Sequence, residues 1–172
     1  VIHKEVFKNN NTQISGNYYT YDNKGNLLEI YEYNKGKVEK PSHAPGYIPK
    51  HYEHRASIHY DEGRPVMMKF NEYNSSAQTI TSYIWGYKNR FIVAKMQGVD
   101  YNLINISDIN SIKSASTENS QSLNREFAEL KNTYSNSHIT TFQYHPLFGV
   151  ERITYPNNIK EQYEYDSFGR LK

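Results

Sequence analysis

Hydrophobic and polar residues alternate along most of the chain, as expected of strands that bury one face. The alternation extends from residue 1 to about residue 98 and resumes at residue 139. Residues 80–85 and 91–96 form the clearest pair of strands, whereas the proline-rich stretch 41–57 predicts a loop. The pattern therefore predicts short antiparallel strands that follow one another along the chain.

The spacing changes to a helical one between residues 103 and 136. Leu123, Phe127, Leu130 and Tyr134 recur on one face of a helix of about 12 to 15 residues that begins at Ser120 or Ser122. We expect Leu123 and Phe127 to be buried, with Glu126 and Glu129 exposed. Earlier in the stretch, Ser107 and Asp108 are expected to cap a short apolar turn.

The turns between strands share one sequence pattern, in which an Asp that follows a tyrosine precedes a glycine. The copies at 19–27 and 163–171 are complete, the copy at 58–66 is one residue shorter, and 142–150 is one residue longer with His-Pro in place of Asp. Tyr144 and Tyr165 are 21 residues apart, which indicates an internal repeat. In a type I hairpin turn the Asp caps the first amides and the Gly adopts a left-handed conformation. The predicted turn residues are Asp22, Gly25, Gly63, Gly149, Asp166 and Gly169.

The signature Tyr-x-Tyr-Asp-x-x-Gly-(Arg/Asn)-Leu resembles the YD-repeat, or Rhs, family of bacterial exported proteins. Residues 83–98, which contain Trp-Gly-Tyr followed by an Ala-Lys strand, are similar to one branch of that family. The resemblance implies β-hairpins in series, secretion or display on the cell surface of a bacterium, and in some members carbohydrate binding. The chain has too few repeats to close a toxin shell and lacks the family's aspartyl self-cleavage motif. We therefore expect a fragment whose partners are neighbouring YD repeats of a parent chain.

The fold class predicted from these observations is mainly β. Antiparallel hairpins of YD-repeat type should form an open twisted sheet with one helical insertion, 103–136, packed on it. The whole of 1–172 is expected to be a single domain, strand-rich over 1–98 and again over 139–172.

Composition and charge exclude several classes of function. The 20 Lys and Arg against 18 Asp and Glu leave a net charge of +2, which argues against a polybasic nucleic-acid arm. The longest apolar runs are far shorter than a membrane span, so we expect no membrane insertion. Cysteine is absent, which excludes disulfides and thiolate catalysis. The 17 tyrosines favour strands with one half-buried face.

The candidate chemistry is sparse. His43, His51, His54 and His59 gather near Glu53, but strand alternation separates them, so they are interpreted as solvated loop histidines and no metal or cofactor is predicted. We predict no catalytic residues. Trp85, Tyr87 and Arg90 are the best candidates for binding a ligand such as a glycan, with Trp85 as a core anchor of the sheet as the alternative.

The sequence thus predicts a non-enzymatic structural and interaction module of a larger secreted or cell-surface YD-repeat protein. Two alternatives stay open: a carbohydrate-binding module that uses exposed aromatic residues, and a hydrolase fragment with an unidentified pair of carboxylates. The strand-rich end at 161–171 carries few positive charges, so we also expect a homodimer joined by pairing of edge strands.

Overall fold

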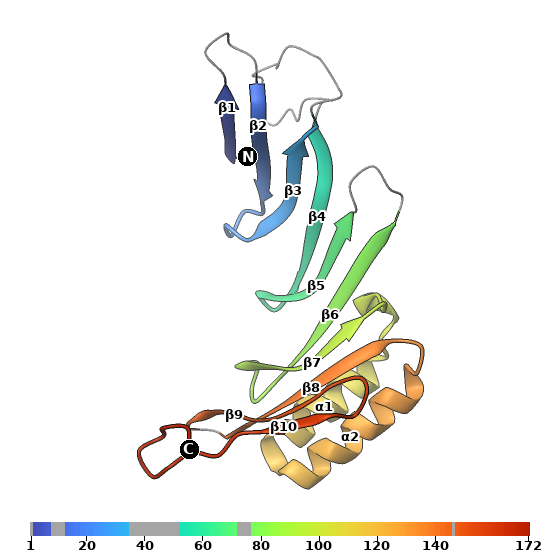
Figure 1. Ribbon diagram of the computed structural model, residues 1–172. Coiled ribbons are helices and arrows are strands. Elements are labelled where there is room, and N and C mark those ends of the chain that lie inside the picture. The colour runs from blue at the N-terminus through green and yellow to red at the C-terminus, as the bar shows by residue number, and fades with distance from the viewer. Residues whose placement is uncertain (1, 8–12, 35–51, 72–76, 146) are drawn as a thin grey trace. The chain divides into compact units, whose positions relative to one another are not determined.

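The computed structural model describes residues 2–7, 13–34, 52–71, 77–145 and 147–172. The chain divides into two compact units, Val1–Thr79 and Ile80–Lys172. That 1–172 is a single domain stays a prediction. Both units are built from antiparallel strands, and the second also carries the helices (Figure 1). The predicted class, mainly β with an open sheet and a helical insertion packed on it, is confirmed.

The first unit is a sheet in which each strand pairs with the strand before it. Its strands are β1 (Ile2–Phe7), β2 (Gln13–Tyr21), β3 (Leu27–Tyr33), β4 (Tyr52–Asp61) and β5 (Arg64–Asn71). β4 begins at Tyr52, so the prediction of a loop over 41–57 is wrong from residue 52 onward, and 41–51 lie outside the described residues. Tyr52 is buried edge-on against Tyr18, with ring centroids 4.5 Å apart, and this burial favours a strand there.

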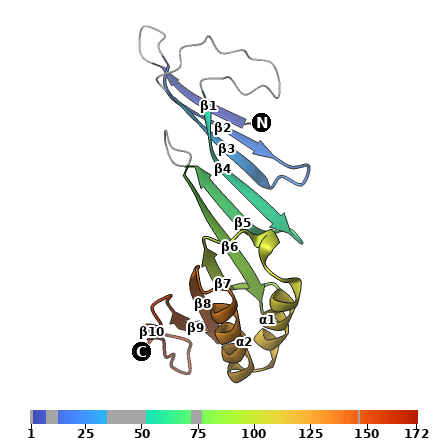
Figure 2. The ribbon, with the colours of Figure 1, turned by 90° about the vertical axis from the view of Figure 1, so that its right-hand side faces the viewer.

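The second unit is also a sheet in chain order, with its helices between the second and third strands. Both helices lie on one face of β7 and β8 (Figure 2). The elements are β6 (Gln78–Gly86), β7 (Phe91–Gln97), η1 (Tyr101–Leu103), α1 (Ile106–Glu118), α2 (Ser120–Thr133), β8 (His138–His145), β9 (Gly149–Thr154) and β10 (Lys160–Gln162).

The insertion contains two helices of 13 and 14 residues, where the sequence predicted a short turn and one helix. Small residues form half of the buried stripe of α1, which is Ile109, Ile112, Ala115 and Ser116, so its hydrophobic pattern is weak. Asn119 caps α2, since its side chain accepts a hydrogen bond from the Ser122 amide at 2.8 Å. Within the described residues, neither helix is long and apolar enough to cross a membrane.

The core of the second unit lies between the helices and the sheet. Leu123 is 1% exposed and Phe127 is 5% exposed, as predicted, and they share a cluster with Ile84, Val93 and Met96. Glu129 is exposed, as predicted. The prediction for Glu126 is wrong, because its side chain is only 13% exposed and pairs with Arg125 at 3.0 Å.

Candidate functional site: the contact between successive hairpins

Asp22 organises the first complete turn of the repeat. Its Oδ1 accepts hydrogen bonds from the amides of Lys24 at 2.8 Å and Asn26 at 2.9 Å. Its Oδ2 accepts a third bond from the Asn26 side chain, and this bond, followed by those from backbone amides, lowers the pKa of the Asp22 carboxyl. Gly25 has φ of 83°, the left-handed conformation predicted for it.

Asp166 repeats this arrangement at the other end of the chain. Its Oδ1 accepts from the amides of Phe168 at 2.9 Å and Arg170 at 3.0 Å, and its Oδ2 accepts from the Arg170 guanidinium at 2.7 Å. The Arg170 amide and then its side chain lower the pKa of Asp166. Gly169 has φ of 76°, as predicted. The same four-residue pattern thus folds into the same hydrogen-bonded turn in both units.

The two variant turns keep parts of this scheme. The shorter turn places Glu62 and Gly63 at φ of 48° and 74°, which is the two-residue hairpin loop expected when one residue is removed. In the longer turn, Nδ1 of His145 accepts from the Leu147 amide at 3.4 Å, so the ring takes the place of the Asp carboxylate. Gly149 follows with φ of 131°.

Tyr165 fastens the last hairpin to the strand before it. Its hydroxyl donates a hydrogen bond to the carbonyl of Val150 at 2.8 Å, and its ring lies 5.8 Å from that of Phe148. At each of the two turn glycines, Gly149 and Gly169, the backbone lies close to a side chain of the neighbouring hairpin. A Cβ at Gly169 would lie 2.8 Å from the Phe148 ring, and one at Gly149 would lie 3.3 Å from the Tyr165 hydroxyl. A side chain at Gly169 would therefore clash with Phe148 in addition to its backbone strain, whereas one at Gly149 would displace the Tyr165 hydroxyl by only a few tenths of an ångström.

Tyr144 makes the same contact one repeat earlier. Its hydroxyl donates to the carbonyl of Ile92 at 2.9 Å, and its ring stacks on Phe91 with centroids 4.5 Å apart. Burial, with a smaller contribution from Tyr87, raises the pKa of the Tyr144 hydroxyl, which stays a donor at neutral pH. In both repeats, then, the tyrosine before the turn packs on an aromatic ring of the previous hairpin and bonds the carbonyl one or two residues after that ring.

The loop that precedes Phe91 has an unusual backbone. Tyr87, Lys88 and Asn89 follow one another with φ of 50°, 59° and 60°, which costs about 1 to 2 kcal/mol for each residue that is not glycine. The Tyr87 amide donates to Oγ of Ser116 at 2.7 Å and so ties the loop to α1. A Cβ at Gly86 would lie within 3 Å of Val93 and Ser116, so only glycine lets the helix approach this strand.

The three residues predicted to bind a ligand do not share one surface. Tyr87 and Arg90 line a shallow depression of about 250 Å³, together with Lys88, Phe91 and Thr117. Trp85 pairs across the strands with Ile92, whereas its neighbours on β6, Ile84 and Gly86, are buried on the helix side. Because side chains alternate along a strand, Trp85 lies on the opposite face, where it is half-buried.

Tyr87 contributes to the core more than to the depression. Its hydroxyl accepts a hydrogen bond from the Tyr144 amide at 3.0 Å, and its ring meets those of Phe91 and Tyr144 edge-on. Burial raises the pKa of Tyr87. Its hydroxyl and ring are therefore largely engaged in holding β8 against the loop.

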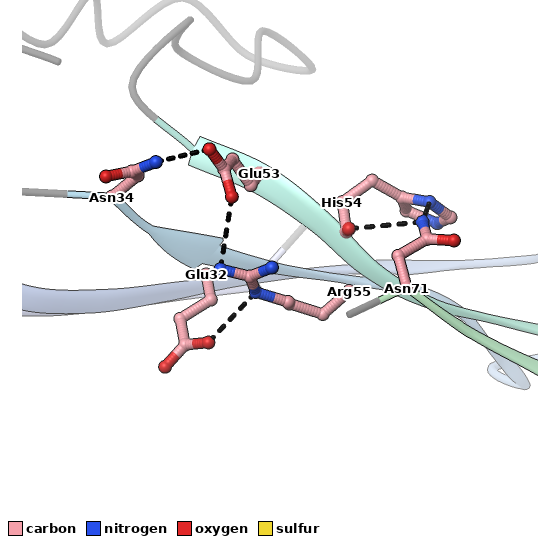
Figure 3. Close-up of polar contacts among 6 residues, drawn as sticks. All are labelled: Glu32, Asn34, Glu53, His54, Arg55 and Asn71. Atoms are coloured by element: carbon pink, nitrogen blue, oxygen red, sulfur yellow. Dashed lines mark hydrogen bonds and ion pairs between the residues drawn. The ribbon is translucent and has the colours of Figure 1, made fainter. Parts of the chain in front are cut away.

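A charged network crosses β3 and β4 of the first unit (Figure 3). Glu32 and Glu53 are directly opposite each other, and Arg55 bonds both, at 3.1 Å to each carboxylate. The amide of Asn34 donates to the second oxygen of Glu53. The register shifts at this place, and the extra residue on β4 is Arg55, so the irregularity brings a cation between two facing carboxylates.

His54 is a structural residue of β4, so its interpretation as a solvated loop histidine is wrong. Its ring lies 5.0 Å from that of Tyr31, and its Nδ1 accepts from the Asn71 amide at 2.8 Å (Figure 3). His59, also on β4, is exposed. His43 and His51 lie outside the described residues. Within those residues, no three potential ligands come together as a metal site.

The contact between hairpins was not predicted as a site. The sequence predicts the repeated tyrosine but not its partner, because Phe91 directly follows one loop and Phe148 lies within another of different sequence. A useful signal would have been that Phe148 and Phe168 both directly precede the turn glycine. Comparison of the chain with protein-family models and with curated proteins gives no match.

Proposed function

We propose that the chain is a non-enzymatic structural and interaction module of a larger secreted or cell-surface protein of YD-repeat type. Its hairpins stack in series, and neighbouring repeats are its partners. The observation that carries the proposal is the repeated tyrosine contact: Tyr144 on Phe91 and Tyr165 on Phe148, each with a hydroxyl bonded to a carbonyl of the previous hairpin.

The last hairpin offers the same surface once more. Phe168 holds the position of Phe148 in its turn, but it is 81% exposed against 37% for Phe148. A further hairpin with a tyrosine before its turn would cover Phe168 and direct its hydroxyl to the carbonyl of Arg170, by analogy with Tyr165 and Val150. The exposed Leu171 lies beside this position and would be buried by the same partner.

An added repeat tests the stacking. A copy of residues 153–172 placed after Lys172 should fold onto the last hairpin, raise the urea midpoint of the second unit and protect the Phe168 amide from hydrogen exchange. Phe168→Ala should remove most of this gain in the extended chain while changing the original chain little. An added repeat that exchanges its amides freely, or a gain that is insensitive to Phe168→Ala, would contradict stacking.

The strand-rich end at 161–171, which forms the last hairpin, also supports self-association as a secondary outcome. A second copy would pair its edge strand antiparallel in a two-fold dimer. Light scattering over a hundredfold range of concentration should show the mass rising above 20.2 kDa. A constant mass at the highest concentration would rule out the dimer and leave the proposal of stacked repeats intact.

The non-enzymatic part of the proposal has its own test. Polysaccharides, peptides, esters and phosphoesters should show no turnover with the purified chain. Reproducible hydrolysis that is lost on replacing one Asp or Glu would establish the hydrolase alternative instead. The carbohydrate-binding alternative draws support from Trp85, which is only partly buried on the face away from the helices. Glycan binding that is abolished by Trp85→Ala would favour it.

A further inference from the structure

A positively charged cavity lies between α2 and the strands β8, β9 and β10. Its volume is about 380 Å³, within the range of small-molecule sites. Three cationic residues line it, one from each of three elements: Lys131 from α2, Arg152 from β9 and Lys160 from β10. No carboxylate is among the lining residues that the structure describes. An excess of positive charge is thus concentrated in one concave place.

Strand alternation produces this excess. Lys160 pairs with Thr154, which pairs in turn with Thr141 of β8, so these side chains share the face that carries the helices. Glu161 pairs with Ile153 and therefore lies on the other face. There its carboxylate accepts a hydrogen bond from the hydroxyl of Tyr163 at 2.7 Å. The acid nearest in sequence to Lys160 is thus kept out of the cavity.

Lys131 is held in place without being neutralised. Nζ of Lys131 donates to the carbonyl of Tyr155 at 3.3 Å and to the side-chain oxygen of Asn158 at 3.1 Å, both uncharged groups. Burial, and then the charge of Lys160, lowers the pKa of Lys131. The described residues provide no ion pair for Arg152 or Lys160. A bound anion would relieve this repulsion.

The uncharged residues of the lining indicate which kind of ligand molecule would bear the anionic group. The side chains of Asn124, Asn158 and Thr154 offer amides and a hydroxyl of the kind that pair with sugar hydroxyl groups, whereas Thr141 is 3% exposed. The one aromatic residue of the lining, Phe127, is 5% exposed, so it offers no ring face for a stacked nucleobase. The lining therefore favours a polar, charged sugar over a nucleotide.

We propose that this cavity binds an acidic saccharide unit, with its sulfate or carboxylate between Arg152, Lys160 and Lys131 and its hydroxyl groups on the side chains of Asn124, Asn158 and Thr154. The guanidinium of Arg152 suits either anion because its donors are arranged as a fork. The site is separate from the stacking contact of the hairpins and does not depend on that function. It also lies on the opposite face of the sheet from Trp85.

Calorimetric titration of the full chain with four probes tests the proposal: a sulfated disaccharide, a uronate-containing disaccharide, a neutral disaccharide and a short single-stranded oligonucleotide. At least one acidic disaccharide should bind, the neutral one should not, and binding should weaken in about 0.5 M NaCl. The comparison of sulfated with uronate sugar shows which anion the cavity prefers. Equal binding of the neutral sugar, stronger binding of the oligonucleotide, or binding of neither acidic sugar would overturn the proposal.

Charge-removing variants locate the site. Arg152→Gln and Lys160→Gln should each weaken binding of the acidic disaccharide roughly tenfold or more. Lys88→Gln and Trp85→Ala, which lie outside the cavity, should leave binding unchanged. Lys160 is exposed, so its variant keeps the test decisive if Arg152→Gln lowers the melting temperature. Binding that survives both cavity variants, or that is lost in Trp85→Ala alone, would place the ligand elsewhere and refute this site.

Discussion

Tyr165 donates its hydroxyl hydrogen bond to the carbonyl of Val150, and this bond joins the last hairpin to the strand that precedes it. The hydroxyl group is half-buried at this contact, and the ring lies against Phe148. Removing the hydroxyl alone therefore separates the hydrogen bond from the packing of the ring.

Tyr165→Phe should lower the free energy of unfolding by about 0.5 to 1.5 kcal/mol, because the Val150 carbonyl loses this donor. Urea denaturation measures the loss. Tyr163→Phe is a matched control, since the Tyr163 hydroxyl bonds only the exposed Glu161 side chain among the contacts described. A loss in the control as large as that in Tyr165→Phe would mean that the contact between hairpins contributes nothing particular.

Substitutions at Gly25 and Gly169 distinguish two costs of adding a side chain, which are backbone strain and a steric clash. Both have positive φ, but a Cβ at Gly25 meets nothing within 4 Å, whereas one at Gly169 meets Phe148. Gly25→Ala should cost about 1 kcal/mol from backbone strain alone. Gly169→Ala should cost measurably more, because either the ring or the turn has to move. Equal losses in thermal unfolding would show that Phe148 yields without penalty.

Phe127 anchors α2 in the core of the second unit. Phe127→Ala should destabilise the protein by about 3 to 5 kcal/mol, since the ring is almost fully buried and leaves a cavity. Glu129→Ala on the exposed face of the same helix should change stability by less than about 0.5 kcal/mol. A small effect of Phe127→Ala in chemical denaturation would indicate that the helix is not part of the folded core.

Arg55 forms ion pairs with the facing carboxylates of both Glu32 and Glu53. Its side chain is 13% exposed, so Arg55→Met should destabilise the first unit by about 1 to 3 kcal/mol. Adding Glu32→Gln to Arg55→Met should recover part of this loss, because one of the two facing charges is then removed. A double-mutant cycle gives the coupling energy. Additive losses would show that Arg55 acts through packing and not through charge.

Protonation of the turn aspartates should lower the stability of the protein in acid. The pKa of Asp166 is lowered below its ordinary value of 3.8 in the folded protein. Its contribution is therefore fully present above pH 3.8 and is lost as the pH falls through the lowered folded-state value. Asp166→Asn keeps an acceptor oxygen but not the charge, so the stability difference between it and the wild type should shrink as the pH is lowered toward 2. A difference that is constant from pH 5 to pH 2 would contradict a charged cap.

The positions of the turns were determined by the sequence alone. Asp22 and Asp166 bond amides two and four residues ahead, and Gly25 and Gly169 adopt the conformation that other residues avoid. These interactions span only a few residues, so they depend on local composition. The strands at 80–85 and 91–96 were predictable for a similar reason, since their alternation is set by the two-residue period of the backbone.

Tertiary structure decided the parts of the fold that depend on distant partners. α1 is held by Gly86, which has no Cβ, and by a hydrogen bond from Tyr87 to Ser116, neither of which appears in the hydrophobic spacing of the helix. His54 is integrated into β4 because Tyr31 and Asn71 flank it.

The placement of Lys160 and Glu161 on opposite faces of the sheet also depends on the folded chain. Lys160 and Glu161 are adjacent in sequence, yet strand pairing places Lys160 beside the cavity under α2 and Glu161 beside Tyr163 on the other face. The alternation itself is local, but which face receives the helix depends on contacts with Ile84, Val93 and Met96, more than 20 residues away along the chain from Phe127. Burial is a property of all the elements that pack together, and no short window of sequence contains them.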